Sequence, residues 1–76
     1  MDINTFIDNF AAQFDDTDRD RFSPETEFKN LDEWCSLMAL SIIAMVDEEY
    51  GVTIVGNDIK GSVTIKDLFD KVAAKA

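Results

Sequence analysis

One uninterrupted stretch, residues 36–50, constrains the fold of this chain more than any other feature. It contains no glycine or proline, and its apolar residues recur at intervals of three and four, which predicts a helix from Ser36 to Tyr50. Five apolar side chains at helical spacing trace one face of this helix: Leu37, Leu40, Ile43, Val46 and Tyr50. Further apolar residues lie on the opposite side, so the helix is apolar nearly all round and has to pack against other elements or against a partner.

Two more helices are predicted on either side of this stretch. Apolar residues at spacings of four, three and four predict a helix from Ile3 to Phe14. Near the C-terminus, Thr64 and Asp67 form a capping box with aspartate in place of glutamate, and this motif predicts a helix from Ile65 to Lys75. Gly51 is well placed to end the central helix.

The connections differ in character. A long loop follows the first helix, and we expect it to be ordered because four large side chains in it need to dock on the helices: Phe22, Phe28, Leu31 and Trp34. The segment Val52–Val55 has the propensity of a strand but no second strand to pair with, so we assign it to a packed loop. Asn57–Lys60 is expected to form one helical turn that ends at Gly61, with Ile59 facing inward.

These elements predict an all-α fold with a single domain over residues 1–76. It is a small four-helix bundle, made of three main helices and one short turn, with a long ordered loop between the first two helices. No apolar run is long enough to cross a membrane, and the N-terminal residues lack the pattern of a secretory signal, so we expect a cytoplasmic protein without membrane insertion. The single cysteine agrees with a reducing compartment.

The charge and the missing histidine narrow the classes of function. Sixteen acidic residues against seven basic ones give a formal net charge of -9, which repels nucleic acid and favours partners with basic patches. Without histidine, Ser-His-Asp triads, Cys-His pairs and His-ligated zinc sites are impossible. We therefore expect the chain to bind or carry rather than to catalyse.

The middle of the chain resembles a known family. Phe28 and Leu31 precede Ser36-Leu37 at the start of the central helix, which ends in the acidic and aromatic run Asp47–Tyr50. This pattern is similar to that of the acyl carrier proteins, in which Phe-x-x-Leu is followed by Asp-Ser-Leu and then by a helix with an acidic and aromatic end. The likeness extends to Val52, Ile54, Ile59 and the segment 64–68, and so covers nearly the whole chain.

The resemblance implies a four-helix carrier fold in which Ser36 is the attachment site of a covalent 4'-phosphopantetheine arm. The chain would then be a non-catalytic, monomeric carrier that tethers acyl intermediates as thioesters for fatty acid, polyketide or related acyl biosynthesis. Its partners would be a phosphopantetheinyl transferase and acyl-transferring or condensing enzymes. A phosphodiester at Ser36 would also lie next to free backbone N–H groups at the positive end of the helix dipole. The alternatives are that Ser36 only caps the helix, that the domain is an unmodified interaction module, and that it carries aminoacyl or peptidyl groups.

Cys35 departs from the family pattern, which has aspartate before the serine. Cysteine is a poor helix cap, so capping passes to Ser36 or is lost, at a cost of roughly 1 kcal/mol. In the family this aspartate assists the transferase, so the resemblance leaves the efficiency of modification open. A thiol at a helix N-terminus is also a candidate for redox chemistry, with a tolerated small residue as the alternative.

A candidate partner face lies on the side of the central helix away from the expected core. Met38, Ile42 and Met45 follow helical spacing there, and adaptable methionines suit a surface that meets several enzymes. The complete candidate face comprises Leu37, Met38, Ser41, Ile42, Met45 and Glu48. The alternative is that these apolar side chains pack against the long loop.

Four acidic residues in the long loop have the ligand spacing of an EF-hand calcium site: Asp16, Asp18, Asp20 and Glu27. The glycine that such a loop needs at its sixth position is replaced by Arg21, and Pro24 stiffens the segment. The departure favours a solvated acidic loop over a calcium site.

Overall fold

Four helices and no strand make up the computed structural model, which describes residues 1–76. The helices are α1 (Ile3–Ala11), α2 (Ser36–Tyr50), α3 (Gly56–Lys60) and α4 (Ile65–Lys75). The predicted all-α fold of three main helices and one short one is confirmed. Two short 3-10 turns, η1 (Arg19–Arg21) and η2 (Phe28–Asn30), lie in the long loop and were not predicted. None of the helices is both long and apolar enough to span a lipid bilayer.

The first helix ends earlier than its apolar spacing predicts. Regular α-helix stops at Ala11, and the chain continues in tighter turns in which Gln13 and Phe14 donate N–H groups to carbonyls three residues back. Phe14 still reaches the core and is 5% exposed. The acidic residues that follow favour solvent, which explains why the helix is not extended past this aromatic residue.

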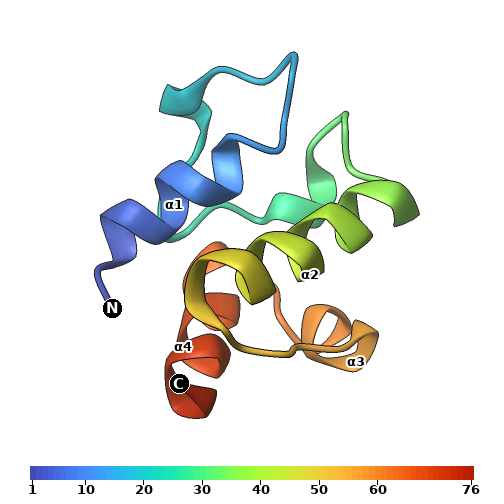
Figure 1. Ribbon diagram of the computed structural model, residues 1–76. Helices are drawn as coiled ribbons and strands as arrows, with labels where there is room; N and C mark the ends of the chain where they lie inside the picture. The colour runs from blue at the N-terminus through green and yellow to red at the C-terminus, as the bar shows by residue number, and fades with distance from the viewer.

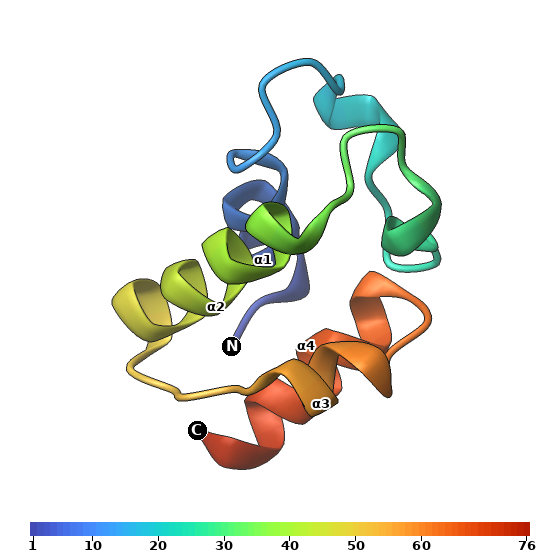
Figure 2. The ribbon, with the colours of Figure 1, turned by 90° about the vertical axis from the view of Figure 1, so that its right-hand side faces the viewer.

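The long loop packs onto the helices, as predicted, and its aromatic side chains complete the core. Phe22 and Phe28 are buried, and both make edge-on contacts with Phe10 of α1. The loop is also tied to the start of α4, where Ile65 and Lys66 donate N–H groups to loop carbonyls. Figure 1 shows this loop arching over one end of the α1 and α2 pair, and Figure 2 shows α3 and α4 lying together on the other side of the molecule.

A single core of 16 buried residues joins the helices and the loop. The segment between α2 and α3 contributes Val52 and Ile54 to this core without forming a strand, which confirms that it is a packed loop. Ile59 anchors α3 as predicted and is 4% exposed. Gly51 ends α2 with a positive φ of 63°, a conformation in which glycine is favoured because it has no Cβ.

The inward face of α2 differs from the prediction. Leu40 was expected on the inward side but is 61% exposed, whereas Ile42 and Met45 of the candidate partner face are 0% and 4% exposed; Leu37, which belongs to both predicted stripes, is 74% exposed. Val46 lies in the core and Ile43 and Tyr50 pack against it, as predicted. The prediction was wrong at Leu40, Ile42 and Met45, because a helix that is apolar on all sides has no clear polar face to orient it. Packing against α1 and the loop decides which side is buried.

Candidate functional site

Ser36 is the first residue of α2 and is exposed to solvent. The preceding residue, Cys35, occupies the N-cap position in an extended conformation and is also exposed. It makes no side-chain hydrogen bond to the helix, so the capping that aspartate would supply here is absent. The first turn of α2 therefore presents its free N–H groups beside the Ser36 hydroxyl.

The other three helices begin differently, because an aspartate side chain accepts backbone N–H groups at each of their starts. Asp2 accepts the N–H of Thr5 at the start of α1 at 3.0 Å. Asp58 accepts the N–H of Val55 at the start of α3 at 2.9 Å. At the start of α4, Asp67 accepts two N–H groups, and its own N–H donates to the Thr64 hydroxyl, which completes the predicted capping box.

These three carboxylates also have lowered pKa values. The pKa of Asp2 falls because the Thr5 N–H stabilises the charged form, and the pKa of Asp67 falls mainly through the N–H groups of Thr64 and Val63. The pKa of Asp58 is lowered first by the Val55 N–H and then by the nearby Lys75. Asp2, Asp58 and Asp67 are thus held as anions at three helix starts, and α2 is the exception.

A cavity of about 400 Å³ opens next to the start of α2. It is lined by Lys29, Trp34, Cys35, Ser36, Ala39, Gly56, Ile59 and Lys60. The loop before α2, the first turn of α2 and the short helix α3 each contribute to its wall. Its volume lies within the range of small-molecule sites, which is roughly 300 to 1,000 Å³.

The cavity combines apolar walls with two cationic side chains. Trp34, Ala39 and Ile59 provide the apolar surface. The ammonium of Lys29 donates to the carbonyls of Ile59 and Lys60 at 3.2 and 3.1 Å, so it is held at the cavity by the end of α3. Such a lining suits a ligand with an anionic group at one end and an apolar or amide part beside it.

Lys29 and Lys60 were not among the residues predicted for the site. Basic residues are scarce in this acidic chain, and that scarcity was a usable signal for both lysines. Their convergence with Ser36 arises only in the fold, because Lys60 lies 24 positions further along the chain.

The candidate partner face is only partly exposed. Ile42 and Met45 are buried and cannot contact a partner, whereas Met38 and Ser41 are half-buried and Leu37 and Glu48 are exposed. Two exposed residues were missed: Leu40, assigned to the core, and Ala44. We define the outer face of α2 as the exposed residues at helical spacing, Leu37, Leu40, Ala44, Asp47 and Glu48.

The four acidic residues with EF-hand spacing, Asp16, Asp18, Asp20 and Glu27, do not come together as a group of metal ligands. Asp16 instead donates its N–H to the carboxylate of Glu33, which also accepts the hydroxyl of Thr17. No group of three or more His, Cys, Asp or Glu side chains lies in position to share a metal ion. In comparisons with protein-family models, curated proteins and solved structures, no match to this chain was found.

Proposed function

We propose that this chain is a carrier protein that receives a 4'-phosphopantetheine group on the Ser36 hydroxyl. The observation that carries the proposal is the position of Ser36. It is an exposed hydroxyl at the one helix start where no aspartate side chain accepts a backbone N–H, and it opens onto a cavity of about 400 Å³. The sequence pattern around Ser36 resembles that of acyl carrier proteins, and this resemblance predicts that the Ser36 hydroxyl is the attachment site.

The residues around Ser36 fit this group. A phosphodiester at the first residue of α2 would meet the free N–H groups of the first turn and the positive end of the helix dipole. Lys29 and Lys60 add positive charge at the cavity, while Trp34 and Ile59 offer apolar surface to the arm. When bound, the group supplies a thiol that carries acyl groups as thioesters, so the protein itself only tethers, shelters and presents them.

The outer face of α2 supports a role in protein contacts. Leu37 and Leu40 lie close to Ser36 in sequence and expose most of their surface, and the acidic pair Asp47 and Glu48 lies at the far end of the same helix. This arrangement suits partners whose docking surfaces have an apolar centre and basic residues nearby. The proposed partners are a phosphopantetheinyl transferase and enzymes that transfer or condense acyl groups.

The proposed cargo is an acyl group of fatty acid, polyketide or related biosynthesis. The absence of histidine supports a chain that is acted upon by enzymes rather than one that catalyses. An aminoacyl or peptidyl cargo is the alternative, and loading assays with matched acyl and aminoacyl thioesters of pantetheine distinguish the two.

Intact-mass measurement tests the proposal. The purified chain is incubated with coenzyme A and a phosphopantetheinyl transferase of broad specificity. We expect the mass to rise by one phosphopantetheinyl group in the wild type and in Ser41→Ala, a half-buried serine of the same helix, but not in Ser36→Ala. An unchanged wild-type mass, or a gain that persists in Ser36→Ala, contradicts the proposal.

A second function, an unmodified interaction module, is favoured by the exposure of Leu37 and Leu40. It predicts that binding to partners is lost in Leu37→Glu and Leu40→Glu while Ser36→Ala binds like the wild type. The carrier function predicts that loss of Ser36 abolishes loading even where the outer face of α2 is intact.

A further inference from the structure

The short helix α3 has little apolar packing of its own. It has five residues, and an isolated helix of that length is not stable in water because nucleation is unfavourable. Ile59 is its only buried side chain. The buried residues Ile54 and Ser62 flank the helix, and the contacts that the long loop and α4 make with its backbone and with Asp58 are polar.

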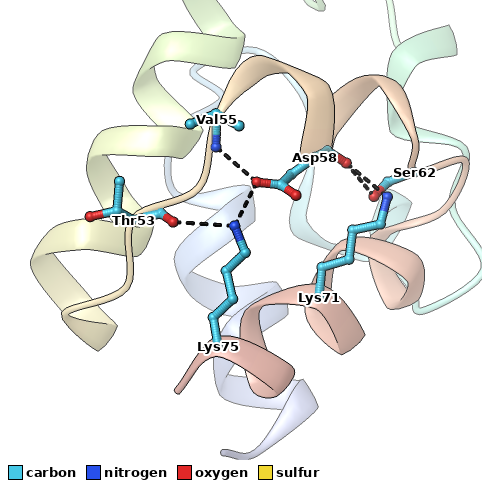
Figure 3. Close-up of polar contacts among 6 residues, drawn as sticks. All are labelled: Thr53, Val55, Asp58, Ser62, Lys71 and Lys75. Atoms are coloured by element: carbon cyan, nitrogen blue, oxygen red, sulfur yellow. Dashed lines mark hydrogen bonds and ion pairs between the residues drawn. The ribbon is translucent and has the colours of Figure 1, made fainter.

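A single carboxylate joins the start of α3 to the end of α4. The Oδ2 atom of Asp58 accepts the N–H of Val55 and also pairs with the ammonium of Lys75, both at 2.9 Å. Figure 3 shows Lys75 reaching up from α4 to this carboxylate, with its ammonium also near the carbonyl oxygen of Thr53 at 3.5 Å. Because the ion pair remains partly exposed, with 41% and 20% of the two side chains accessible, dissolved salt can screen it.

Two more lysines hold the carbonyl groups of α3, which the short helix leaves largely without intrahelical partners. Lys71 of α4 donates to the carbonyl of Asp58 at 3.1 Å, as Figure 3 shows. Lys29 donates to the carbonyls of Ile59 and Lys60 from the side of the long loop. Cations at the C-terminal end of a helix also interact favourably with its dipole.

Gly61 leaves room for one of these contacts. A Cβ at this position would lie 2.7 Å from the ammonium of Lys71, so any larger residue would push the lysine away from α3. We call Lys29, Lys71 and Lys75 the lysine clamp.

We propose that α3 is a movable wall of the cavity beside Ser36, that the lysine clamp holds this wall in place, and that ionic strength sets how far the cavity widens. Gly56, Ile59 and Lys60 of α3 line this cavity opposite the chain segments that contribute Trp34 and Ser36. Residues 51–55, which form no helix or strand, connect α3 to α2, and a turn at residues 61–64 connects it to α4. The proposal does not depend on attachment of a group to Ser36.

Salt is expected to act on α3 and on the rest of the fold in opposite directions. With a net charge of -9, the whole chain is destabilised by repulsion among its acidic residues, so added salt should raise its thermal midpoint. The same salt weakens the ion pair of the clamp, between Lys75 and Asp58, because the screening length falls from about 10 Å at 0.1 M to about 3 Å at 1 M. A general effect of salt would change the stability of α3 and of the whole chain in the same direction. Loosening of α3 while the whole chain is stabilised would therefore point to the clamp.

Amide hydrogen exchange of the full chain, followed by NMR, tests the first part. Gly61 after α3 and Gly51 after α2 are matched reporters, since each donates its N–H to a helix carbonyl at 2.9 Å. Between about 0.05 and 1 M NaCl we expect protection of Gly61 to fall roughly fivefold while that of Gly51 is maintained or rises. If both amides respond in the same direction, the clamp does not control α3.

Charge-removing variants provide a second measurement. At low salt the double variant Lys71→Gln with Lys75→Gln is expected to lower Gly61 protection as high salt does in the wild type. Lys66→Gln is the matched control, because Lys66 lies on the same helix but pairs with Asp70 within it. Equal protection of Gly61 in the double variant and in this control overturns the proposal.

Trp34, the only tryptophan, reports on the cavity itself. We expect the neutral quencher acrylamide to reach Trp34 more readily at high salt and in the double variant. If Gly61 loses protection while quenching of Trp34 is unchanged, α3 loosens without opening the cavity, and the claim that it is a wall under ionic control is wrong.

Discussion

The starts of α2 and α4 differ in how their free N–H groups are satisfied. At α4, Thr64 and Asp67 close the helix end with a reciprocal capping box. At α2, Cys35 makes no such bond, and Ser36 and Leu37 stay exposed beside a cavity. We call the capped start of α4 the closed start, and helix stability alone explains it. We call the uncapped start of α2 the open start. It lacks that stabilisation, which is a local exception of the kind expected where a chain binds a ligand or is modified.

The largest expected effect on stability comes from comparing a buried side chain further along α2 with an exposed side chain at its start. Met45 is buried further along the helix, so Met45→Ala should lower the free energy of unfolding by about 3 kcal/mol through a cavity in the core. Leu37→Ala should change it by less than about 0.5 kcal/mol, because that side chain is exposed. Urea unfolding followed by circular dichroism measures both, and equal losses would contradict the burial pattern of α2.

The next effect contrasts the two helix starts directly. Thr64→Ala removes a hydrogen bond to the N–H of Asp67 and should lower the free energy of unfolding by about 1 kcal/mol. Ser36→Ala at the start of α2 should leave it within about 0.5 kcal/mol of the wild type. A loss at Ser36 as large as the loss at Thr64 would mean that Ser36 is a structural cap after all.

A smaller effect should follow from closing the open start. Cys35→Asp places a capping carboxylate at the N-cap of α2 and should raise the free energy of unfolding by roughly 0.5 to 1 kcal/mol. By the resemblance to acyl carrier proteins, it should also speed modification by the transferase. Cys35→Ala is the control and should change neither quantity appreciably. No gain in stability would show that the N–H groups of α2 are already satisfied.

The smallest effect is a dependence on pH at the closed start. The pKa of Asp67 is lowered from 3.8, so its stabilisation is present above that value and is lost as the pH falls through its folded pKa. The stability difference between the wild type and Asp67→Asn should therefore shrink below pH 3.8. The corresponding difference for Ser36→Ala should not change with pH. Urea midpoints measured between about pH 3 and 7 test this, and a constant difference for Asp67→Asn would contradict the assigned cause.

Local signals predicted much of the fold. The boundaries of α2 and α4 match the prediction because glycine, the capping box and helical spacing act over a few residues. The inward face of α2 was not predictable, since apolar residues surround this helix and its rotation depends on packing with α1 and the long loop. The end of α1 was misplaced for a related reason, because Phe14 reaches the core from a turn rather than from the helix.

The candidate site was predictable only in part. Ser36 and the weak cap at Cys35 follow from short motifs, and the structure has Cys35 as an N-cap without a side-chain bond. The cavity was not foreseen, because Lys29, Ser36 and Gly56 come from three separate segments that only the tertiary fold brings together. Within the lysine clamp, Lys29 contacts residues 30 and 31 positions away, and Lys71 and Lys75 contact Asp58 from 13 and 17 positions away.

Mapping the modified residue by peptide mass spectrometry tests the central claim most directly. The chain has four serines, Ser23, Ser36, Ser41 and Ser62, and one cysteine, so a transferred group can be assigned among few positions. After reaction with coenzyme A and a phosphopantetheinyl transferase, we predict that the group is found on the peptide that contains Ser36 and on that residue alone. A group on another serine or on Cys35, or no group at all, would contradict the assignment of the open start of α2 as the attachment site.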